Sequence, residues 1–463
     1  MSFRDLRQFL NRLEQTGDIV RIREQVRVEH EIGAITYRAA VLGSPALHFT
    51  NVHSSEIPVV SNLFGTRRRI AAALETDVEH LTEEWRKRTV KAIEPMVVKD
   101  APCKENVILG DRIDLMQLPV PIFNELDGGP FITAGCLVSG DAWGARNIGI
   151  YRNQVHGPRT LGILAAPYRH VILHAKSNGG RIPVAIAIGV QPTVFLAAAA
   201  DYPSGVDEIG KAGAFQGEPV ELVRCETSPL LVPATAEIVI EGELILDQCL
   251  MEGPFGEFTG YYGTAAPRPT IEVKAVTHRD MPIYQAGYTG RPPNENVVAV
   301  GVAREADILG QVSLPGLRAI HLTDGGCGYF NAVASIDKRF EGYGKMMAMA
   351  ILGTWAGRAI KMLVMVDADI EPSNANDVEW ALATRVQPDR DVEIIKQTVG
   401  VILDPSIAKA DRLSGASRTS KMIIDATKYD SVDYEIEVLP HRDVLHRIVR
   451  DWDRFGIPSG SPR

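Results

Sequence analysis

Apolar and polar residues follow two different spacings along the first hundred residues. Between residues 5 and 13 the apolar side chains recur every three or four positions and Gly17 follows, which predicts a helix that ends near this glycine. Residues 18–28 alternate as a strand does. Further elements are expected at residues 29–40 (helix), 46–52 (strand) and 78–97 (charged helix). Residues 1–100 therefore predict a small α/β unit.

The pattern changes from about residue 101, where proline- and glycine-rich turns separate short runs of β-branched residues. Strands are expected at residues 147–155, 159–165, 184–189, 220–226, 236–245 and 270–278. So many short strands in succession favour a barrel or a curved sheet. Residues 101–296 therefore predict a β-rich middle domain.

From about residue 297 the spacing returns to an α/β pattern. Elements are expected at residues 330–336 (strand), 342–360 (long apolar helix), 362–366 (strand), 378–384 (helix) and 442–455 (amphipathic helix). The last of these carries an apolar face that could cross to a neighbouring subunit. Residues 297–463 thus complete an α/β chain of three parts.

One uncharged stretch, residues 182–200, is long enough to cross a membrane on length alone. Pro183, Gly189 and Pro192 divide it, however, so a buried strand over 184–188 and a helix starting after Pro192 are expected instead. The charged N-terminus lacks the apolar core of a signal peptide. No integral membrane segment is expected.

Composition narrows the classes of partner and compartment. The net charge is −9 and no basic stripe dominates, which argues against a nucleic-acid partner. The five cysteines are scattered without a CxxC pair, so neither a disulfide framework nor a zinc–thiolate site is expected. A reducing cytoplasmic location fits this usage best.

The stretch MEGPFGEFTGYY holds two carboxylates, Glu252 and Glu257, in a loop rich in glycine and aromatic residues. Residues five apart do not share a helix face, but they can converge on a loop. An apolar surround raises a carboxyl pKa and suits the group to proton donation near neutral pH. Two other interpretations stay open: a surface turn with solvated acids, and a glycosidase pair of carboxylates.

Arg152 ends the motif NIGIYR. On one regular strand Asn147 and Arg152 would face opposite sides, unless Gly149 marks a bulge that resets the register. A guanidinium can bind a carboxylate through two hydrogen bonds. From this motif alone, an ordinary surface arginine explains the residue equally well.

His170 and His174 form an HxxxH pair that would share one helix face, but HExxH and a nearby cysteine are absent. Each is explained as well by a structural role, and Glu208 by a favourable position at a helix start. Taken together, Asn147, His170 and Glu208 would offer oxygens and one imidazole. That set suits Mn²⁺ or Mg²⁺ rather than zinc, usually in the service of a phosphate group. Neither GxGxxG nor a Walker A loop occurs.

Five motifs in order give the chain a resemblance to a known family. They are NIGIYR, VPATAEIVIEGEL, EGPFGEFTGYY, YTGRPPNE and VDADIEPSNANDVEWALATR. With their spacings they resemble the UbiD family of decarboxylases, from about Phe3 to about Lys428. The resemblance implies an α/β N-terminal unit, a central split β-barrel that binds the flavin, and a C-terminal α/β domain that mediates dimers or hexamers.

The resemblance also implies cofactors and site residues. The cofactor would be prenylated FMN, supplied by a partner flavin prenyltransferase. The acid–arginine–acid triad falls on Arg152, Glu252 and Glu257. The ligands of the divalent metal, Mn²⁺ or Mg²⁺, fall on Asn147, His170 and Glu208, with His174 as the alternative to His170. Ile150, Tyr151 and Arg152 would join these ligands at the cofactor. Potassium is expected near the carbonyls of residues 197–200 and Glu208, although Ala145 stands where some relatives have tryptophan.

The implied reaction is reversible, non-oxidative decarboxylation of an unsaturated acid. Arg152 would hold the substrate carboxylate and pair with Glu252, while Glu257 would deliver the proton that replaces CO₂. A small aromatic, hydroxyaromatic or heteroaromatic acid is the expected substrate. Three alternatives remain: a 3-polyprenyl-4-hydroxybenzoate decarboxylase of ubiquinone synthesis, a metal-dependent hydrolase that uses Glu252 and Glu257 without a flavin, and a catalytically silent scaffold.

Overall fold

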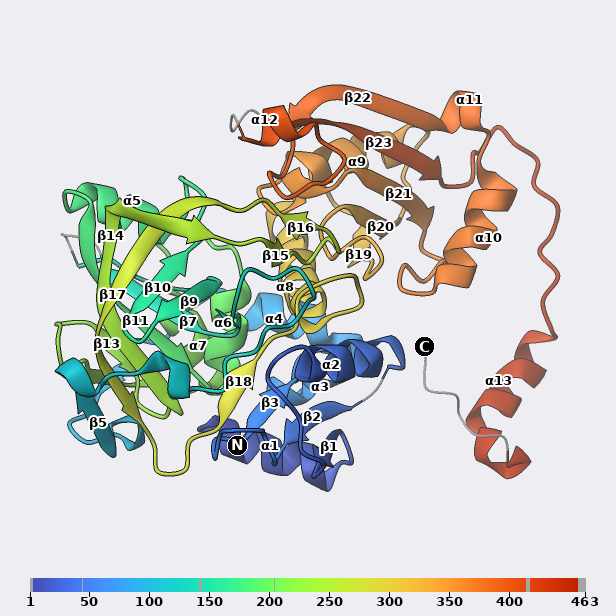
Figure 1. Cartoon of the computed structure of the whole chain (residues 1–463). Coiled ribbons are helices and arrows are strands. Elements are labelled where there is room, and N and C mark those ends of the chain that lie inside the picture. Colours follow the sequence, from blue (N-terminus) through green and yellow to red (C-terminus); the bar gives the residue numbers. More distant parts are fainter. Residues whose placement is uncertain (1–2, 44, 141–143, 204, 414–416, 457–463) are drawn as a thin grey trace.

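The computed structural model describes residues 3–43, 45–140, 144–203, 205–413 and 417–456. It has a mixed α/β fold, as expected. A small N-terminal sheet, a large curled sheet and a C-terminal sheet are arranged around the long helix α8 (Glu295–Gln311), as Figure 1 shows.

The N-terminal sheet has the order β1-β2-β3-β18. Its strands are β1 (Ile19–Ile22), β2 (Ala46–Phe49), β3 (Val59–Ser61) and, from far later in the chain, β18 (Tyr284–Ala286). The helices of this N-terminal region are α1 (Leu6–Gln15), α2 (Glu31–Val41), α3 (Arg67–Ala73) and α4 (Leu81–Arg88). The helices expected at 5–13 and 29–40 are confirmed.

Two N-terminal expectations were too long. The strand expected over 18–28 ends at Ile22, because the residues that follow are polar and the ladder with β2 stops there. The helical segment expected over 78–97 is helical only as far as Arg88. The β-branched pair Thr89-Val90 follows, and Pro95 then directs the chain into the short strand β4 (Met96–Val97).

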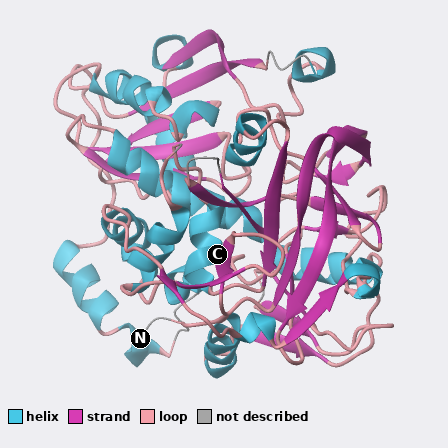
Figure 2. Cartoon of the chain, turned by 90° about the vertical axis from the view of Figure 1, so that its left-hand side faces the viewer, coloured by secondary structure: helices cyan, strands magenta, loops and turns pink. Residues whose placement is uncertain are grey.

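The middle region forms a curled, largely antiparallel sheet of nine strands within the described residues, which Figure 2 shows as the tall, bent strands. Its order is β6 (Phe131–Ile132), β9 (Asn153–Gly157), β10 (Thr160–Ile163), β17 (Ala266–His278), β14 (Ile238–Glu252), β11 (Arg181–Ile188), β7 (Cys136–Gly140) and β8 (Arg146–Ile150), with β5 (Asn106–Leu109) paired to β17. The sheet is a curled half-barrel, which confirms the β-rich middle region.

Three short helices and a small sheet accompany this half-barrel. The helices are α5 (His170–Ser177), α6 (Pro192–Ala199) and α7 (Glu208–Gln216), and the sheet is β13 (Leu231–Pro233), β12 (Glu221–Arg224) and β4. The uncharged stretch 182–200 is divided between β11 and α6, as expected. Among the described residues, no helix combines the length and the apolar character needed to cross a membrane.

The C-terminal sheet has the order β19-β20-β21-β23-β22. Its elements are β19 (Leu317–Leu322), β20 (Asn331–Ile336), α9 (Tyr343–Gly353), β21 (Met362–Asp367), α10 (Ala375–Arg385), α11 (Pro388–Asp391), β22 (Val392–Val399), α12 (Lys409–Leu413) and β23 (Arg418–Ala426). The helix expected over 342–360 ends early, because Thr354 adopts an extended backbone after Gly353. The other elements expected between 330 and 384 are confirmed.

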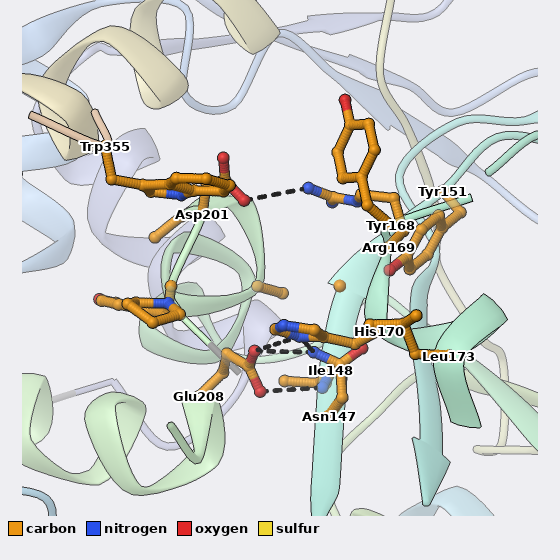
Figure 3. Close-up of a pocket in the computed structure, with 15 residues that line it drawn as sticks. Asn147, Ile148, Tyr151, Tyr168, Arg169, His170, Leu173, Asp201, Glu208 and Trp355 are labelled. Carbon is orange, nitrogen blue, oxygen red and sulfur yellow. Dashed lines mark hydrogen bonds and ion pairs between the residues drawn. The ribbon is translucent and has the colours of Figure 1, made fainter. Parts of the chain in front are cut away.

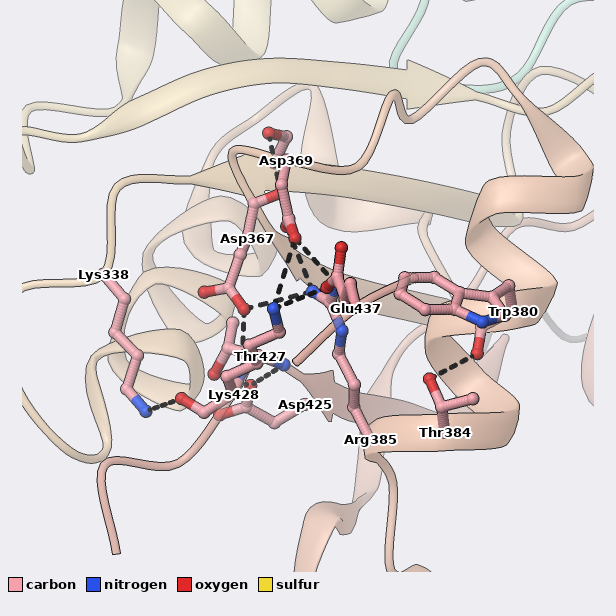
Figure 4. Close-up of polar contacts among 11 residues, drawn as sticks. Lys338, Asp367, Asp369, Trp380, Thr384, Arg385, Asp425, Thr427, Lys428 and Glu437 are labelled. Atoms are coloured by element: carbon pink, nitrogen blue, oxygen red, sulfur yellow. Dashed lines mark hydrogen bonds and ion pairs between the residues drawn. The ribbon is translucent and has the colours of Figure 1, made fainter. Parts of the chain in front are cut away.

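A tail leaves this sheet and ends in α13 (Arg442–Arg450), which Figure 1 shows standing apart from the rest of the chain. The buried side chain of Arg385 binds Asp369 at 2.8 Å, Asp367 at 3.3 Å and, from the tail, Glu437 at 3.4 Å. Figure 4 shows this cluster, in which Lys428 also binds Glu437 at 2.7 Å. The cluster fastens the start of the tail to the sheet.

One hydrophobic core joins the N-terminal helices to α6, α7 and α8. Phe64 stacks on Phe195 of α6 with ring centroids 4.8 Å apart, and Trp85 meets Phe215 of α7 edge to face at 4.7 Å. A second core lines the half-barrel. Ile148 of β8 belongs to the first core together with residues of α6 and α7, so this core holds the three elements close to one another.

Candidate active site

The two acidic residues lie at the end of the longest strand of the half-barrel. The 15-residue β14 ends at Glu252, and the short strands β15 (Phe255–Gly256) and β16 (Tyr262–Gly263) follow. The loop is tied down at two glycines: Gln154 Oε1 accepts the N–H of Gly253 and Asp127 Oδ1 accepts that of Gly256, both at 2.8 Å.

Gly256 is needed for close packing. A Cβ atom there would lie 2.3 Å from Asn124 Nδ2, far inside any real contact. A larger residue would therefore displace either the loop or the Asn124 amide, which donates to Asp127 and to the Thr289 carbonyl. The loop that carries Glu257 is thus positioned by backbone hydrogen bonds and by the absence of a side chain.

The structure brings Arg152 between the two acids. The strand expected over 147–155 is interrupted: β8 ends at Ile150 and β9 begins at Asn153, so Arg152 lies at the break. Its Nε donates to Glu252 Oε1 at 2.8 Å and its Nη2 to Oε2 at 3.3 Å, while its Nη1 donates to Glu257 Oε1. The guanidinium carbon lies 4.7 Å from the centre of the Phe255 ring.

All three side chains are withdrawn from water, with exposures of 9% for Arg152, 0% for Glu252 and 9% for Glu257. Burial raises the pKa of Glu257, and the charge and hydrogen bond of Arg152 offset only part of that rise. Glu257 therefore holds a proton at a higher pH than an exposed glutamate does. Burial alone would lower the pKa of Arg152, but the two carboxylates raise it, so the arginine stays charged.

A second cluster joins Asn147 of β8, His170 at the first position of α5 and Glu208 at the first position of α7 (Figure 3). Asn147 Nδ2 lies 2.7 Å from Glu208 Oε1 and 3.0 Å from His170 Nδ1. Burial lowers the pKa of His170, so its imidazole is neutral near pH 7, as a metal ligand requires. Burial raises the pKa of Glu208 to about 7.

The structure brings His170, and not His174, to Asn147 and Glu208. His174 lies one helical turn further along α5, where its Nδ1 is 3.0 Å from Ser139 Oγ. The sequence had left these two histidines as alternatives.

The cluster fits a hard divalent cation. Among the described residues Asn147 Oδ1 is buried without a hydrogen-bond partner, so this oxygen is available to a cation. Turning the amide over would place this oxygen beside His170 Nδ1 and Glu208 Oε1, giving two oxygens and one imidazole nitrogen around one point. No metal-binding group of three or more His, Cys, Asp or Glu occurs in the described chain, so the amide of Asn147 is essential to this set.

A pocket opens beside the cluster, and its residues come from four separate segments of the chain. It is lined by Asn147, Gly149, Tyr151, Tyr168, Arg169, His170, Ala198, Ala200, Asp201, Tyr202, Glu208 and Trp355, among others. Tyr151 connects the pocket to the triad, because Arg152 is the next residue. Ile150, also expected at the cofactor, is not among the lining residues and packs instead against the core.

Sequence reasoning missed three of the lining residues as parts of a site. Arg169 stands next to a motif histidine and could have been noticed there. Asp201 follows the helix expected after Pro192, and no neighbouring motif marks it as part of a site. Trp355 lies more than 140 residues further along the chain, and no local pattern signals its position at this pocket.

Comparison with known proteins identifies the family. A model described as the 3-octaprenyl-4-hydroxybenzoate carboxy-lyase Rift-related domain matches residues 96–292. The corresponding N-terminal and C-terminal domain models match residues 10–89 and 297–426. The chain is also 36% identical to an uncharacterized protein of Archaeoglobus fulgidus, with 92% of each chain aligned.

Solved structures agree with this assignment. The UbiD-class enzyme HmfF from Pelotomaculum thermopropionicum, in complex with FMN, is 39% identical, with a TM-score of 0.87 over 95% of this chain and 98% of its own. Vanillic acid decarboxylase of Sedimentibacter hydroxybenzoicus, in its open form, is 32% identical, with a TM-score of 0.88 over 98% and 99%. The chain belongs to the UbiD family and is an enzyme of the carboxy-lyase class.

Proposed function

We propose that this enzyme reversibly removes CO₂ from a small aromatic, hydroxyaromatic or heteroaromatic acid with the help of prenylated FMN. One observation carries the proposal: Arg152 is buried between Glu252 and Glu257, and bonds both. The relatives support the cofactor and the substrate class, since HmfF is known in complexes with FMN and with prenylated FMN and another relative is a vanillic acid decarboxylase.

The cofactor would be anchored by its phosphate. Asn147, His170 and Glu208 would hold Mn²⁺ or Mg²⁺, and the cation would bind the phosphate oxygens. Tyr151 lines the same pocket and would contact the flavin together with Arg152, whereas contact with Ile150 stays a prediction, because that side chain packs against the core. Potassium beside the carbonyls of residues 197–200 and Glu208 remains a prediction. Ala198 and Ala200 line the same pocket, which is consistent with it.

Arg152 is suited to receive the substrate carboxylate. A guanidinium carries five N–H bonds, and three are directed at Glu252 and Glu257. The other two, one on each terminal nitrogen, can donate to a substrate carboxylate. Because Glu252 holds the guanidinium through two hydrogen bonds, the substrate would be bound in a fixed orientation.

Glu257 is suited to proton transfer. When bound, prenylated FMN supplies the electron sink that accepts the electron pair left on the substrate carbon when CO₂ departs. The carboxyl proton of Glu257 is then transferred to that carbon and replaces CO₂, leaving a carboxylate that Arg152 stabilises. In the reverse direction the Glu257 carboxylate takes the proton from the carbon as CO₂ adds.

The hydrolase alternative fits the geometry less well. A hydrolytic carboxylate needs an oxygen free to activate water, but both oxygens of Glu252 accept hydrogen bonds from Arg152. A glycosidase pair would also need an open gap between the two carboxylates, and here the guanidinium lies between them. The buried triad also argues against an inactive scaffold, because burying three charged side chains costs free energy and a scaffold needs no such group.

The tail supports a homo-oligomer. Ile436 is 94% exposed and Val438 98%, and α13 exposes Val444, Leu445 and Val449. Apolar residues in such numbers on one segment are typical of a surface that meets a partner. An evolved form of the relative HmfF is dimeric. We propose that a second copy of the chain, in a dimer or hexamer, covers this tail, and that a flavin prenyltransferase supplies the cofactor.

The test is to produce the protein together with a flavin prenyltransferase, with and without Mn²⁺. Native mass spectrometry and the visible spectrum should show one prenylated FMN per chain. CO₂ release should then be detected in a screen of hydroxybenzoates, furan carboxylates and pyrrole carboxylates. Glu208→Ala should lose the flavin, whereas Glu257→Gln should keep it. A chain that binds the metal and no flavin would overturn the proposal and favour the hydrolase.

A further inference from the structure

One carboxylate at the rim of the anchoring pocket is surrounded by arginines. Asp201 Oδ2 accepts from Arg358 Nη2 at 2.9 Å, and Asp201 Oδ1 accepts from Arg169 Nη1 at 3.3 Å. Arg304 Nη2 lies 3.8 Å from Oδ2. Burial raises the pKa of Asp201, but the arginines lower it by more, so the group stays ionised.

The arginines come from distant parts of the chain. Arg169 directly precedes α5, Arg304 lies in α8, and Arg358 lies in the short turn after α9. Asp201 lies two residues after the end of α6, whose side chains are almost all buried. The carboxylate is therefore a fixed point of the half-barrel to which the C-terminal part of the chain is attached.

The guanidinium of Arg358 stacks on the indole of Trp355. The guanidinium carbon lies 3.6 Å from the centre of the Trp355 ring, and Trp355 lines the pocket as the contribution of the C-terminal part (Figure 3). The segment is tied to its own part of the chain as well. Gln311 Oε1 accepts the backbone N–H of Trp355 at 2.9 Å, and Lys421 Nζ donates to the Arg358 carbonyl at 2.7 Å.

Simple electrostatics makes an acid at this position unfavourable. Asp201 lines the same pocket as Asn147, His170 and Glu208, where a phosphate would be anchored. A carboxylate repels a phosphate dianion, and it also reduces the attraction that Arg169 and Arg358 would exert. If charge were its only effect, Asp201 would weaken the binding of the cofactor.

We propose that Asp201 is a positioning residue that holds the Trp355–Arg358 segment over the anchoring pocket and thereby slows release of the flavin nucleotide. The inference rests on the proposed function, because it assumes that the pocket binds the phosphate of a flavin mononucleotide. Asp201 binds Arg358, Arg358 stacks on Trp355, and Trp355 closes one side of the pocket. The Asp201 carboxylate is therefore unfavourable for phosphate binding but keeps the Trp355–Arg358 segment in position.

If Asp201 positions the Trp355–Arg358 segment, Asp201→Asn should have the opposite effect from the one expected if Asp201 only repels the phosphate. Asparagine has one acceptor oxygen in place of two and no charge, so the contact with the arginines is weakened, and release of FMN should be about tenfold faster, the effect expected for one lost hydrogen bond to a charged group. Loss of a repelling charge would instead slow release. The measurement is stopped-flow flavin fluorescence of the full-length protein loaded with FMN at saturating Mn²⁺, after mixing with a flavin-trapping apoprotein. Slower or unchanged release would overturn the proposal.

Two further variants keep the test decisive. Trp355→Ala leaves every charge in place and should speed release by a similar factor, and the double variant should be no faster than the faster single variant, because both changes act through one segment. Asp111→Asn, which removes an exposed carboxylate paired with Arg159, should leave release unchanged. Unchanged release from Trp355→Ala would overturn the proposal even if Asp201→Asn fails to fold.

Failure of the proposed function would look different. If the wild-type protein binds no FMN at all in the presence of Mn²⁺, the assumption about the pocket is wrong. If wild-type FMN binding is tight and depends on Glu208, but neither variant speeds release, only the role of Asp201 is wrong.

Discussion

The buried triad makes a stability prediction that needs no cofactor. Arg152→Met keeps most of the volume of the side chain but leaves Glu252 and Glu257 buried without their cation. Removing one partner of a buried ion pair costs about 3–5 kcal/mol. In a domain of roughly 200 residues, about 4 kcal/mol corresponds to a fall in Tm of about 8–16 °C.

The penalty should depend on pH. Burial already raises the pKa of Glu257, and Arg152 is the main group that opposes this rise. In the variant the folded-state pKa therefore lies further above the unfolded-state value. For such a carboxyl group, stability is fully present below the unfolded value and is lost as the pH rises through the folded value. The difference in Tm between wild type and variant should consequently be large at pH 8 and smaller at pH 5.5.

The assay is the Tm of cofactor-free protein from circular dichroism at these two pH values. Arg159→Met is the matched control, because its partner Asp111 is 99% exposed, and it should shift Tm by only about 1–3 °C. Adding Glu257→Gln to Arg152→Met should recover part of the loss at pH 8. A variant as stable as wild type, or a loss that is equal at both pH values, would refute this reasoning.

Three further outcomes can be checked separately. Glu257→Gln should keep the flavin but lose at least about a hundredfold in kcat, and the fall in wild-type activity as the pH rises through the Glu257 pKa should disappear; full activity would exclude this proton donor. Gly256→Ala should lower kcat at least about tenfold, because the new Cβ would meet Asn124, whereas Gly157→Ala meets nothing within 4 Å and should be neutral in the same assay. Light scattering should show the proposed oligomer for the full chain and a monomer after deletion of residues 431–463, and an oligomer that survives the deletion would show that other surfaces hold the copies together.

The spacing of apolar residues predicted those elements that keep one pattern of buried and exposed positions from end to end. The helices at 5–13 and 29–40 and the division of residues 182–200 into β11 and α6 are examples. The ends of elements were predicted less well, because tertiary contacts decide them. The helix expected to reach residue 360 stops at Gly353, where the chain turns to bring Trp355 to the pocket and Arg358 to Asp201.

The site shows the same limit. Glu252 and Glu257 could be noticed from their loop, but Arg152 lies 100 residues from Glu252, and only family resemblance linked it to them. No pattern in the sequence signals the break between β8 and β9 that turns Arg152 toward the acids. Asp201 was likewise not recognised from the sequence, because two of the arginines beside it, Arg304 and Arg358, lie more than 100 residues further along the chain.

The N-terminal sheet has a consequence for how the chain is made. Its fourth strand, β18, pairs with β3 through residues 284–286, although β3 ends at Ser61. A ribosome must therefore synthesise more than 220 further residues before the β3 edge can be covered. Until then the nascent chain presents an unpaired strand whose valines are completely buried in the finished protein. The first hundred residues therefore depend on β18, from the middle of the chain, to complete their sheet. A product that ends before β18 would expose the unpaired edge of β3 and would be prone to aggregate.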